Sequence, residues 1–427
     1  MPGWVVVVVR VLGAGAMSED VAAVAGARVV RLRALAWQVF VPTAVFGMGA
    51  GAAVPMYPLR ALELGAGAGV AGIVVALSGF GQILADLPAG QLIARIGERR
   101  SVAAASVCGA LGVLLAIAAP NLGWLAAGML LTGAASALWG LARQTYLVAV
   151  IPAADRGRAL SMLAGSQRFG VFAGPFLGAA ATHLFGVTGA MWLQLASMLV
   201  GGALMMSVSD IEDDAAQVRR GLGAVVAENR RVLGTLGLGA LATGAARAAR
   251  TALLPLWAAH IGMSAPAISL IFGIAGAVDV LMSYPSGIWL DRYGRRATGT
   301  PSLLLFAIGY TALPFAATTF GLCVIAVILG FANGLSNGLI MTVGSDIAPP
   351  GAQAEFLGAW RLTHDLGMFL GPIAVGFIGA ATTLGAASIA LGAVATAGAA
   401  SIRRWFPTVP LLSGQPVDDM GERRNAH

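Results

Sequence analysis

Six ionisable residues stand near the middle of long apolar stretches, where each needs a chemical reason to be present. They are Arg168, Arg247, Arg250, Asp279, His364 and Asp365. An ionisable side chain is costly in hydrocarbon, so it normally faces a cavity or a partner. An acid that alternates between an arginine partner and a proton can couple proton movement to another event. These six residues form either buried pairs that stabilise one conformation or a site that exchanges protons. The sequence leaves both interpretations open.

The elements that must position these residues are helices that cross a membrane. The chain has 427 residues, of which 58% are hydrophobic and 11% are charged, and its mean hydropathy is +0.83. Apolar runs of about 20 residues, enough to cross a hydrocarbon core of about 30 Å, recur from end to end. The sequence predicts an all-α membrane protein with twelve spans at 37–59, 68–89, 101–120, 124–148, 158–183, 187–208, 234–258, 264–287, 299–319, 320–344, 354–379 and 382–401.

Polar segments and arginine placement give the expected organisation. Two blocks of spans, 37–208 and 234–401, are joined by a cytoplasmic linker at 209–233 and flanked by cytoplasmic segments at 1–36 and 402–427. Met1 and Met17 are both candidate starts. With this arrangement, the loops on the side opposite the termini contain a single arginine, Arg60. Arginine-rich loops stay in the cytoplasm, so both termini are predicted there, in a cytoplasmic (inner) membrane.

Composition and motifs exclude several function classes. The net charge is +7, but the basic residues are spread over short loops, which argues against nucleic acid as a partner. Both cysteines, Cys108 and Cys323, fall inside apolar runs and carry no disulfide or metal signal. The sequence shows no phosphate-binding loop, zinc-spaced cluster or nucleophile–base set. We therefore expect neither an enzyme nor a cofactor.

The two blocks of spans are related to each other by an offset of 197 residues. Gly97 falls on Gly294, and Pro175 falls on Pro372. The same offset holds from residue 58 to residue 175 without a gap. Chance apolar similarity does not keep glycine, proline and arginine in step over such a length. The halves are thus predicted to be parallel repeats, which usually bind substrate between them near the midplane.

A charged loop motif follows the second and eighth spans. The second copy is complete, with Gly287, Asp291, Arg292, Gly294, Arg295 and Arg296. The first copy keeps Gly90, Arg95, Gly97 and Arg99, but has Ala94 and Glu98 where Asp and Arg are expected. A chain of six plus six spans with this motif resembles the major facilitator superfamily of transporters. The resemblance implies two pseudo-symmetric six-helix bundles, a monomer, and transport of a small-molecule solute across the lipid bilayer.

The resemblance also implies partners for the charged loop residues. The loop Asp faces the start of a helix in the other half, and the closing arginine meets an acid at the end of the fourth or tenth span. Asp346 offers that acid in the second half, beside Arg295. The matching first-half position is Ala149. We expect one strong cytoplasmic latch and one weak one; the alternative is that these charges only set topology.

Within the membrane, the family arrangement places span five beside span eight and span two beside span eleven. Depth along the helices then suggests two pairs across the halves, Arg168 with Asp279 and Asp86 with Arg361. Arg247 or Arg250 is expected to reach Asp365. His364 is either a proton carrier or a simple hydrogen-bonding residue. Arg143 either lines the cytoplasmic vestibule or extends to the membrane surface.

Span five carries a second motif, formed by Gly170, Gly174, Pro175 and Gly178. In this superfamily such a motif is associated with exporters and antiporters, although generic Gly-Pro packing of helices explains it as well. One departure concerns Met129, which stands near the place where many drug exporters of this superfamily carry an arginine in span four. Any proton coupling must therefore use other residues.

Charge balance gives the expected substrate class. Five arginines stand within the spans, Arg143, Arg168, Arg247, Arg250 and Arg361, against Asp86, Asp279 and Asp365. A net positive cavity favours an anionic or amphiphilic solute. Asn333 and Asn337 form either a substrate-facing stripe or a packing contact between helices. The sequence thus favours a secondary transporter, with proton-coupled efflux of a small organic solute as the leading hypothesis. A lipid or glycolipid flippase and a solute importer of the same fold are the alternatives.

Overall fold

The computed structural model describes residues 35–151, 156–206, 228–349 and 353–406. The first half contains η1 (Ala36–Phe40), α3 (Val41–Ala53), α4 (Met56–Glu63), α5 (Ala68–Ile96), α6 (Glu98–Ala118), α7 (Leu122–Val150), α8 (Arg156–Phe185) and α9 (Val187–Met205). The second contains α11 (Arg230–His260), α12 (Ala265–Ala312), η3 (Leu313–Phe315), α13 (Thr319–Leu335), α14 (Leu339–Ile347), α15 (Gln353–Ala381) and α16 (Leu384–Trp405).

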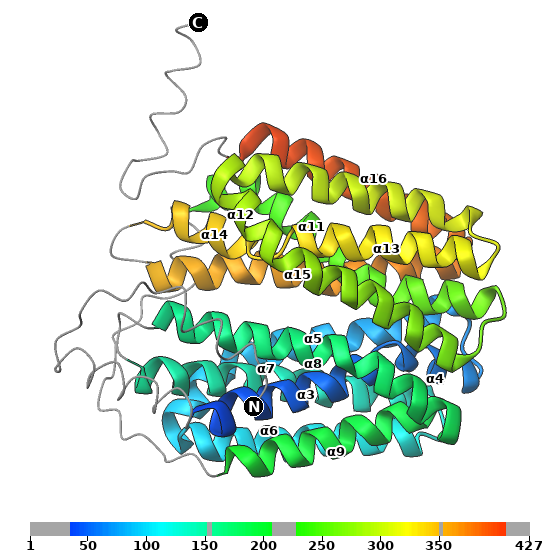
Figure 1. Cartoon of the computed structure of the whole chain (residues 1–427), viewed down its shortest axis with the longest axis horizontal. Coiled ribbons are helices and arrows are strands. Elements are labelled where there is room, and N and C mark those ends of the chain that lie inside the picture. Colours follow the sequence, from blue (N-terminus) through cyan, green and yellow to red (C-terminus); the bar gives the residue numbers. More distant parts are fainter. Residues whose placement is uncertain (1–34, 152–155, 207–227, 350–352, 407–427) are drawn as a thin grey trace, which may run out of the picture.

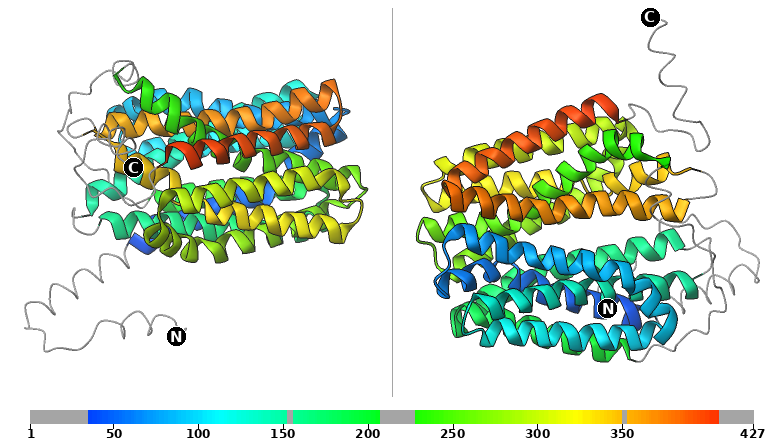
Figure 2. Two further views of the ribbon diagram at one scale, coloured as in Figure 1. Left: turned by 90° about the horizontal axis from the view of Figure 1, so that it is seen from above. Right: turned by 180° about the vertical axis from the view of Figure 1, so that it is seen from behind.

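Each half forms a bundle of long helices, and the two bundles lie side by side (Figures 1 and 2). In the described part, ten helical stretches are long and apolar enough to cross a membrane. One of them, Ala265–Phe315, holds two helices, because Gly294 interrupts α12 with φ 85° and ψ 175°. Because one of the ten stretches holds two helices, these stretches account for eleven spans in the described part. The 30-residue α8 is the twelfth. The predicted all-α architecture is confirmed.

Backbone geometry repeats with the same offset of 197 residues as the sequence. Gly97 has φ 80° and ψ 166°, close to the values of Gly294. Gly65 and Gly262, which end the first span of each half, have φ 86° and 80°. Side-chain-bearing L-residues rarely adopt such positive φ values, so these four turns need glycine. The repeat is therefore fixed in the connections as well as in the helices.

The Gly-Pro motif of span five is a packing surface between α8 and α3. A Cβ atom built on Gly170 would lie 2.1 Å from the carbonyl oxygen of Ala44, and one on Gly174 would lie 2.3 Å from that of Met48. Gly178 faces Ala52 in the same row. The second half repeats the contact, with Gly367 and Gly371 of α15 against Leu241 and Ala245 of α11. The glycines let the helix backbones approach closely in both halves.

The bundles approach each other most closely at the end of the molecule that carries α4. There a Cβ atom on Gly69 of α5 would lie 2.4 Å from the backbone nitrogen of Ala380 of α15, and Gly72 faces Gly376. At the opposite end, which carries Arg295 and is called the arginine-rich end below, the ribbons of α5 and α8 diverge from those of α14 and α15 (Figure 1). The structure is therefore closed at the α4 end.

Replacement of Gly367 by alanine tests the packing of α15 on α11. The new Cβ would lie 2.0 Å from the carbonyl oxygen of Leu241, so the helices must separate. We expect Gly367→Ala to lower the free energy of unfolding by about 1–3 kcal/mol, as overpacking does.

The matched control is Gly358→Ala on the same helix, where an added Cβ meets no atom within 4 Å. It should raise stability by about 1 kcal/mol through helix propensity. Thermal unfolding in detergent, followed by tryptophan fluorescence, measures both. Equal midpoints for the two variants would contradict the packing assignment.

Candidate functional site

The centre of the second bundle holds a carboxylate bound by two amide groups. Asp279 lies on α12, and it accepts hydrogen bonds from Asn333 Nδ2 at 2.7 Å and from Asn337 Nδ2 at 2.8 Å. The same Asn337 nitrogen lies 2.9 Å from Ser283 Oγ. Asn333 belongs to α13, whereas Asn337 lies in the break between α13 and α14, just before Gly338 with φ 80°. The break in span ten thus places the second amide against the carboxylate.

Asn337 also connects this carboxylate to an arginine. Its Oδ1 atom accepts a hydrogen bond from Arg247 Nη2 at 3.1 Å. Arg247 lies close enough to Asp279, Arg168 and Arg250 to interact with all three electrostatically. No ion pair joins Arg168 to Asp279 in the part of the chain that the structure describes. The predicted Arg168–Asp279 pair is not formed, and the carboxylate oxygens of Asp279 accept hydrogen bonds from the two asparagines instead.

Arg250 lies one helical turn from Arg247 on α11. Its Nε and Nη1 atoms are shielded from solvent and have no hydrogen-bond partner among the described residues. A guanidinium group presents five N–H donors in a fixed plane that matches a carboxylate or a phosphate. Buried donors without partners are costly and uncommon in proteins. Arg250 is therefore the described side chain of this site with the clearest capacity for an additional anionic partner.

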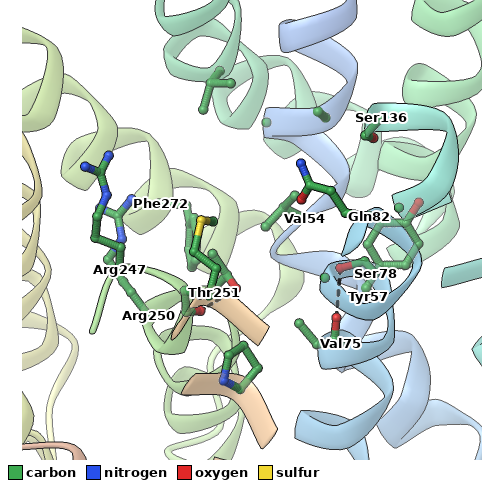
Figure 3. Close-up of a pocket in the computed structure, with 18 of the residues that line it drawn as sticks. Val54, Tyr57, Val75, Ser78, Gln82, Ser136, Arg247, Arg250, Thr251 and Phe272 are labelled. Atoms are coloured by element: carbon green, nitrogen blue, oxygen red, sulfur yellow. Dashed lines mark hydrogen bonds between the residues drawn. The ribbon is translucent and has the colours of Figure 1, made fainter. Parts of the chain in front are cut away.

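A cavity of about 450 Å³ lies between the two bundles and is lined by residues of both. Its second-bundle wall holds Arg247, Arg250, Asp279, Asn333, Asn337 and Asp365, and Arg168 of α8 adds a further charge from the first bundle. Figure 3 shows Arg247 and Arg250 on one side of the pocket, facing Tyr57 and Gln82 on the other. The site residues that the sequence singled out within the spans are thus largely gathered in one cavity.

The opposite wall sets polar side chains among apolar ones, and Arg168 is its charged residue; the sequence analysis did not identify the uncharged polar groups. Tyr57 donates a hydrogen bond to Gln194 Oε1 at 2.6 Å, and both residues line the cavity. The other polar groups of this wall are Ser78, Gln82, Thr132, Ser136 and Gln167. The available signal was the presence of glutamines inside apolar spans, since an amide there also needs a partner.

Arg143 is not among the residues that line the cavity. Its Nη1 atom donates to Gln167 Oε1 at 2.6 Å, and its guanidinium carbon lies 4.9 Å from the centre of the Trp139 ring. Trp139 is buried and stacks on Phe46, with ring centroids 4.2 Å apart. Arg143 therefore connects α7 to α8 and holds the side chain of Gln167, which itself lines the cavity.

The acid of span eleven takes local partners. Asp365 accepts a hydrogen bond from Arg361 Nε at 3.4 Å, one helical turn away, and its Oδ1 atom lies 3.1 Å from His364 Nδ1. The structure describes no ion pair from Asp365 to Arg247 or Arg250. The expectation that one of these arginines reaches Asp365 is therefore wrong for this conformation.

The predicted pair of Asp86 with Arg361 is also not formed among the described residues. The carboxylate of Asp86 interacts electrostatically with both Arg361 and Asp365 across the α5–α15 contact. Arg361 is bonded to Asp365 instead, because that acid lies on the same helix face at the spacing of one turn.

At the arginine-rich end, Arg295 is bonded to Asp346 as the resemblance implies. Arg295 Nε lies 2.6 Å from Asp346 Oδ2, and Nη2 lies 3.0 Å from Oδ1. Such two-pronged contacts are among the stronger charged hydrogen bonds. The equivalent first-bundle positions are the buried Glu98, whose Oε2 atom has no hydrogen-bond partner in the described part, and Ala149. The pair is thus present in one bundle and absent from the same place in the other.

The remaining charged residues of the loop motif form no ion pair within the described ranges. They are Arg95, Arg99, Asp291, Arg292 and Arg296. The partner expected for Asp291 is the start of α8, and 152–155 lie outside the described residues. Also among the described residues, no group of three or more His, Cys, Asp and Glu side chains could hold a metal ion.

Comparison with known proteins agrees with this architecture. The sequence model of the Major Facilitator Superfamily matches residues 39–234 and 236–424. YddS of Bacillus subtilis (strain 168), an uncharacterized MFS-type transporter, is 24% identical over 344 residues, which are 74% of this chain and 77% of that protein. The solved nucleoside transporter NupG is 14% identical with a TM-score of 0.71, covering 87% of this chain and 99% of that one. A solved D-xylose-proton symporter is 14% identical with a TM-score of 0.67, covering 88% and 98%.

The structural likenesses are below 25% identity and show the fold alone. The match of the family model covers both bundles and their junction. Together with the cavity between two repeated bundles, it identifies a carrier of small molecules and not an enzyme. The chain belongs to the Major Facilitator Superfamily and is a multi-pass membrane protein that carries out secondary transport.

Proposed function

We propose that this transporter moves a small organic anion and couples that movement to protons. The observation that carries the proposal is the unpartnered guanidinium of Arg250 in a cavity that also holds Asp279. Three arginines line the cavity, and the nearby Asp279 carries the charge that opposes them. The other lining acid, Asp365, is engaged by Arg361 and His364. An anionic group on the solute would supply the missing negative charge.

Asp279 is the proposed proton carrier. Its charge stabilises Arg247 through Asn337, so protonation would leave the three arginines with less compensation. Protonation of Asp279 and binding of an anion therefore favour each other, and this linkage is reciprocal. Such coupling supports movement of proton and anion in the same direction. Uptake along an inward proton gradient is the direction that this charge arrangement supports.

Export is the second candidate, and the span-five Gly-Pro motif favours it. Export by exchange requires that the solute and the proton compete for one group, as a cationic group on the solute would do at Asp279. The motif glycines pack α8 on α3, and the repeat packs α15 on α11 in the same way. Because this packing also occurs in the other half, the motif supports export less strongly than the charges support cotransport.

The polar and charged groups that stand among the apolar residues of the cavity lining support a soluble solute rather than a lipid. Amide, hydroxyl and charged groups face the cavity from both bundles. The uncharged polar wall with Gln82 and Gln194 would bind the neutral polar part of the solute, while the arginines bind its acid. We further propose that the arginine-rich end and both termini face the cytoplasm, that the protein acts as a monomer in the cytoplasmic membrane, and that this conformation is open to the cytoplasm.

The first prediction from this proposal concerns proton coupling. Asp279→Asn keeps the size of the side chain but removes its titratable proton. In proteoliposomes with an internal pH dye and a panel of organic anions, wild type should acidify the lumen when its solute is added outside. Asp279→Asn should abolish this signal while solute binding remains. Asp365→Asn is the control and should keep most of it, because Asp365 is held by Arg361 and His364.

The sign of the pH change in the lumen distinguishes cotransport from exchange. Cotransport carries protons inward with the solute and acidifies the lumen, whereas exchange makes it more alkaline. Loss of the signal in Asp365→Asn, with a normal signal in Asp279→Asn, would reject Asp279 as the proton carrier. A solute flux without any proton movement would reject coupling altogether.

The second prediction concerns the anion. A hydrogen bond to a charged group contributes about 1.5–3 kcal/mol, so Arg250→Gln should weaken binding of the transported anion about 10- to 150-fold. Titration of the purified protein, followed by tryptophan fluorescence, measures the affinity. Arg231→Gln, an exposed arginine outside the cavity lining, is the control and should bind normally. Equal affinity of wild type for the acid and for its uncharged amide would reject anion recognition.

A further inference from the structure

A second pocket lies on the outer surface at the arginine-rich end, away from the transport cavity. It has a volume of about 400 Å³ and is lined by Tyr293, Arg296, Ala297, Thr300, Pro301 and Arg403. Most of this lining belongs to α12 just beyond its interruption at Gly294, and Arg403 belongs to the last turn of α16. The two helices pack against each other along their length, so the pocket sits at their common end.

The charge of this pocket is positive and uncompensated. Arg296 and Arg403 form no ion pair and no hydrogen bond with the residues that the structure describes, and no acidic residue lines the pocket. Two neighbouring arginines rest on aromatic rings instead: Arg292 lies 5.5 Å from the centre of the Tyr293 ring, and Arg404 lies 5.1 Å from that of Trp405. Arginine planes match the oxygens of a phosphate group.

Thr300 supplies a neutral hydrogen-bonding group in the same pocket. Its Oγ1 atom is shielded from solvent and has no partner in the described part of the chain. Threonine in a helix commonly satisfies its hydroxyl by bonding the carbonyl four residues earlier. Thr298 does so, with its Oγ1 atom 2.9 Å from the oxygen of Gly294. The hydroxyl of Thr300 therefore lacks the usual partner within the helix, and the residue lines the pocket.

Aromatic residues place this pocket at the membrane surface. Trp289, Tyr293 and Trp405 are all exposed around it. Tryptophan and tyrosine gather where the hydrocarbon core meets the lipid headgroups. The transport cavity, in contrast, lies between the bundles and shares no lining residue with this pocket. A ligand of the second pocket would therefore meet it from the surrounding lipid layer.

An apolar stripe leads from the pocket along α12 toward the membrane centre. Ala297, Pro301, Leu304 and Ile308 follow each other at intervals of three or four residues, so they lie on one face of the helix. Leu304 and Ile308 are exposed on that face. A molecule with an anionic head and a long apolar chain would match the pocket and the stripe at once.

We propose that the pocket between the ends of α12 and α16 binds the phosphate headgroup of an anionic phospholipid. Arg296 and Arg403 contact the phosphate oxygens, Thr300 donates its hydroxyl, and an acyl chain lies along Leu304 and Ile308. Basic pockets between helices at the cytoplasmic membrane surface are suited to such headgroups. The proposal is independent of the transported solute, because it concerns a different surface.

The test is a lipid titration of the full-length protein in detergent, followed by native mass spectrometry. Wild type should bind phosphatidylglycerol more tightly than phosphatidylcholine. Each arginine near an anionic lipid contributes about fivefold in affinity, so Arg296→Gln with Arg403→Gln should weaken phosphatidylglycerol binding about 25-fold. The matched control is Arg230→Gln with Arg231→Gln, which removes the same charge from exposed positions at the start of α11.

The control variant should bind phosphatidylglycerol nearly as tightly as wild type, because Arg230 and Arg231 do not line the pocket. An equal loss in both double variants would overturn the site in favour of unspecific attraction. Displacement of phosphatidylglycerol by inorganic phosphate at matched concentration would show that free phosphate is the ligand and would overturn the lipid assignment. Unfolding midpoints of both variants within a degree or so of wild type would exclude misfolding as the cause of a loss.

Discussion

A carboxylate in the middle of a membrane helix must be solvated by the protein itself, and the way Asp279 meets this requirement organises the centre of the molecule. A buried charge without hydrogen bonds costs several kcal/mol. Two asparagine amides provide them, and one comes from a break in span ten that ends at Gly338. Irregular backbone is tolerated at this depth where it lines a cavity. The charge, the helix break and the cavity are therefore parts of one arrangement.

This arrangement is asymmetric although the backbone is symmetric. Positive-φ glycines and close glycine contacts recur at an offset of 197 residues in both bundles. The polar side chains do not recur: Leu254 and Leu391 stand where the first bundle has the hydrogen-bonded Tyr57 and Gln194. Asp279 likewise corresponds to Gln82, and Asn333 to Ser136. The repeated backbone thus holds the acid Asp279 on one side of the cavity and the neutral Gln82 at the equivalent position of the other, while Asp365 corresponds to Arg168.

The sequence predicted the spans, the repeat and the Arg295–Asp346 contact, because these depend on hydrophobic length, glycine positions and a loop motif. It did not predict the partners of the buried charges. Depth along a helix places two residues at the same level, but an ion pair also needs the right rotation and no nearer competitor. Asn333 and Asn337 bind Asp279 in place of the predicted Arg168. Asp365 binds Arg361 in place of the predicted Asp86. The Asn337–Gly338 pair is a common turn signal and would have indicated the break in span ten.

The surplus positive charge of the cavity also bears on how the transporter changes conformation. Closing the arginine-rich end would remove water from the cavity that Arg168, Arg247 and Arg250 line, and burying charges that lack an opposite charge is expensive. In this structure Asp279 accepts hydrogen bonds from the two asparagines. The Nε and Nη1 atoms of Arg250 have no hydrogen-bond partner among the described residues. On the proposed function, the bound anion lowers the cost of closure by pairing with these donors. The same interaction that recognises the solute would then favour the closed, loaded state, which links binding to movement without a separate device.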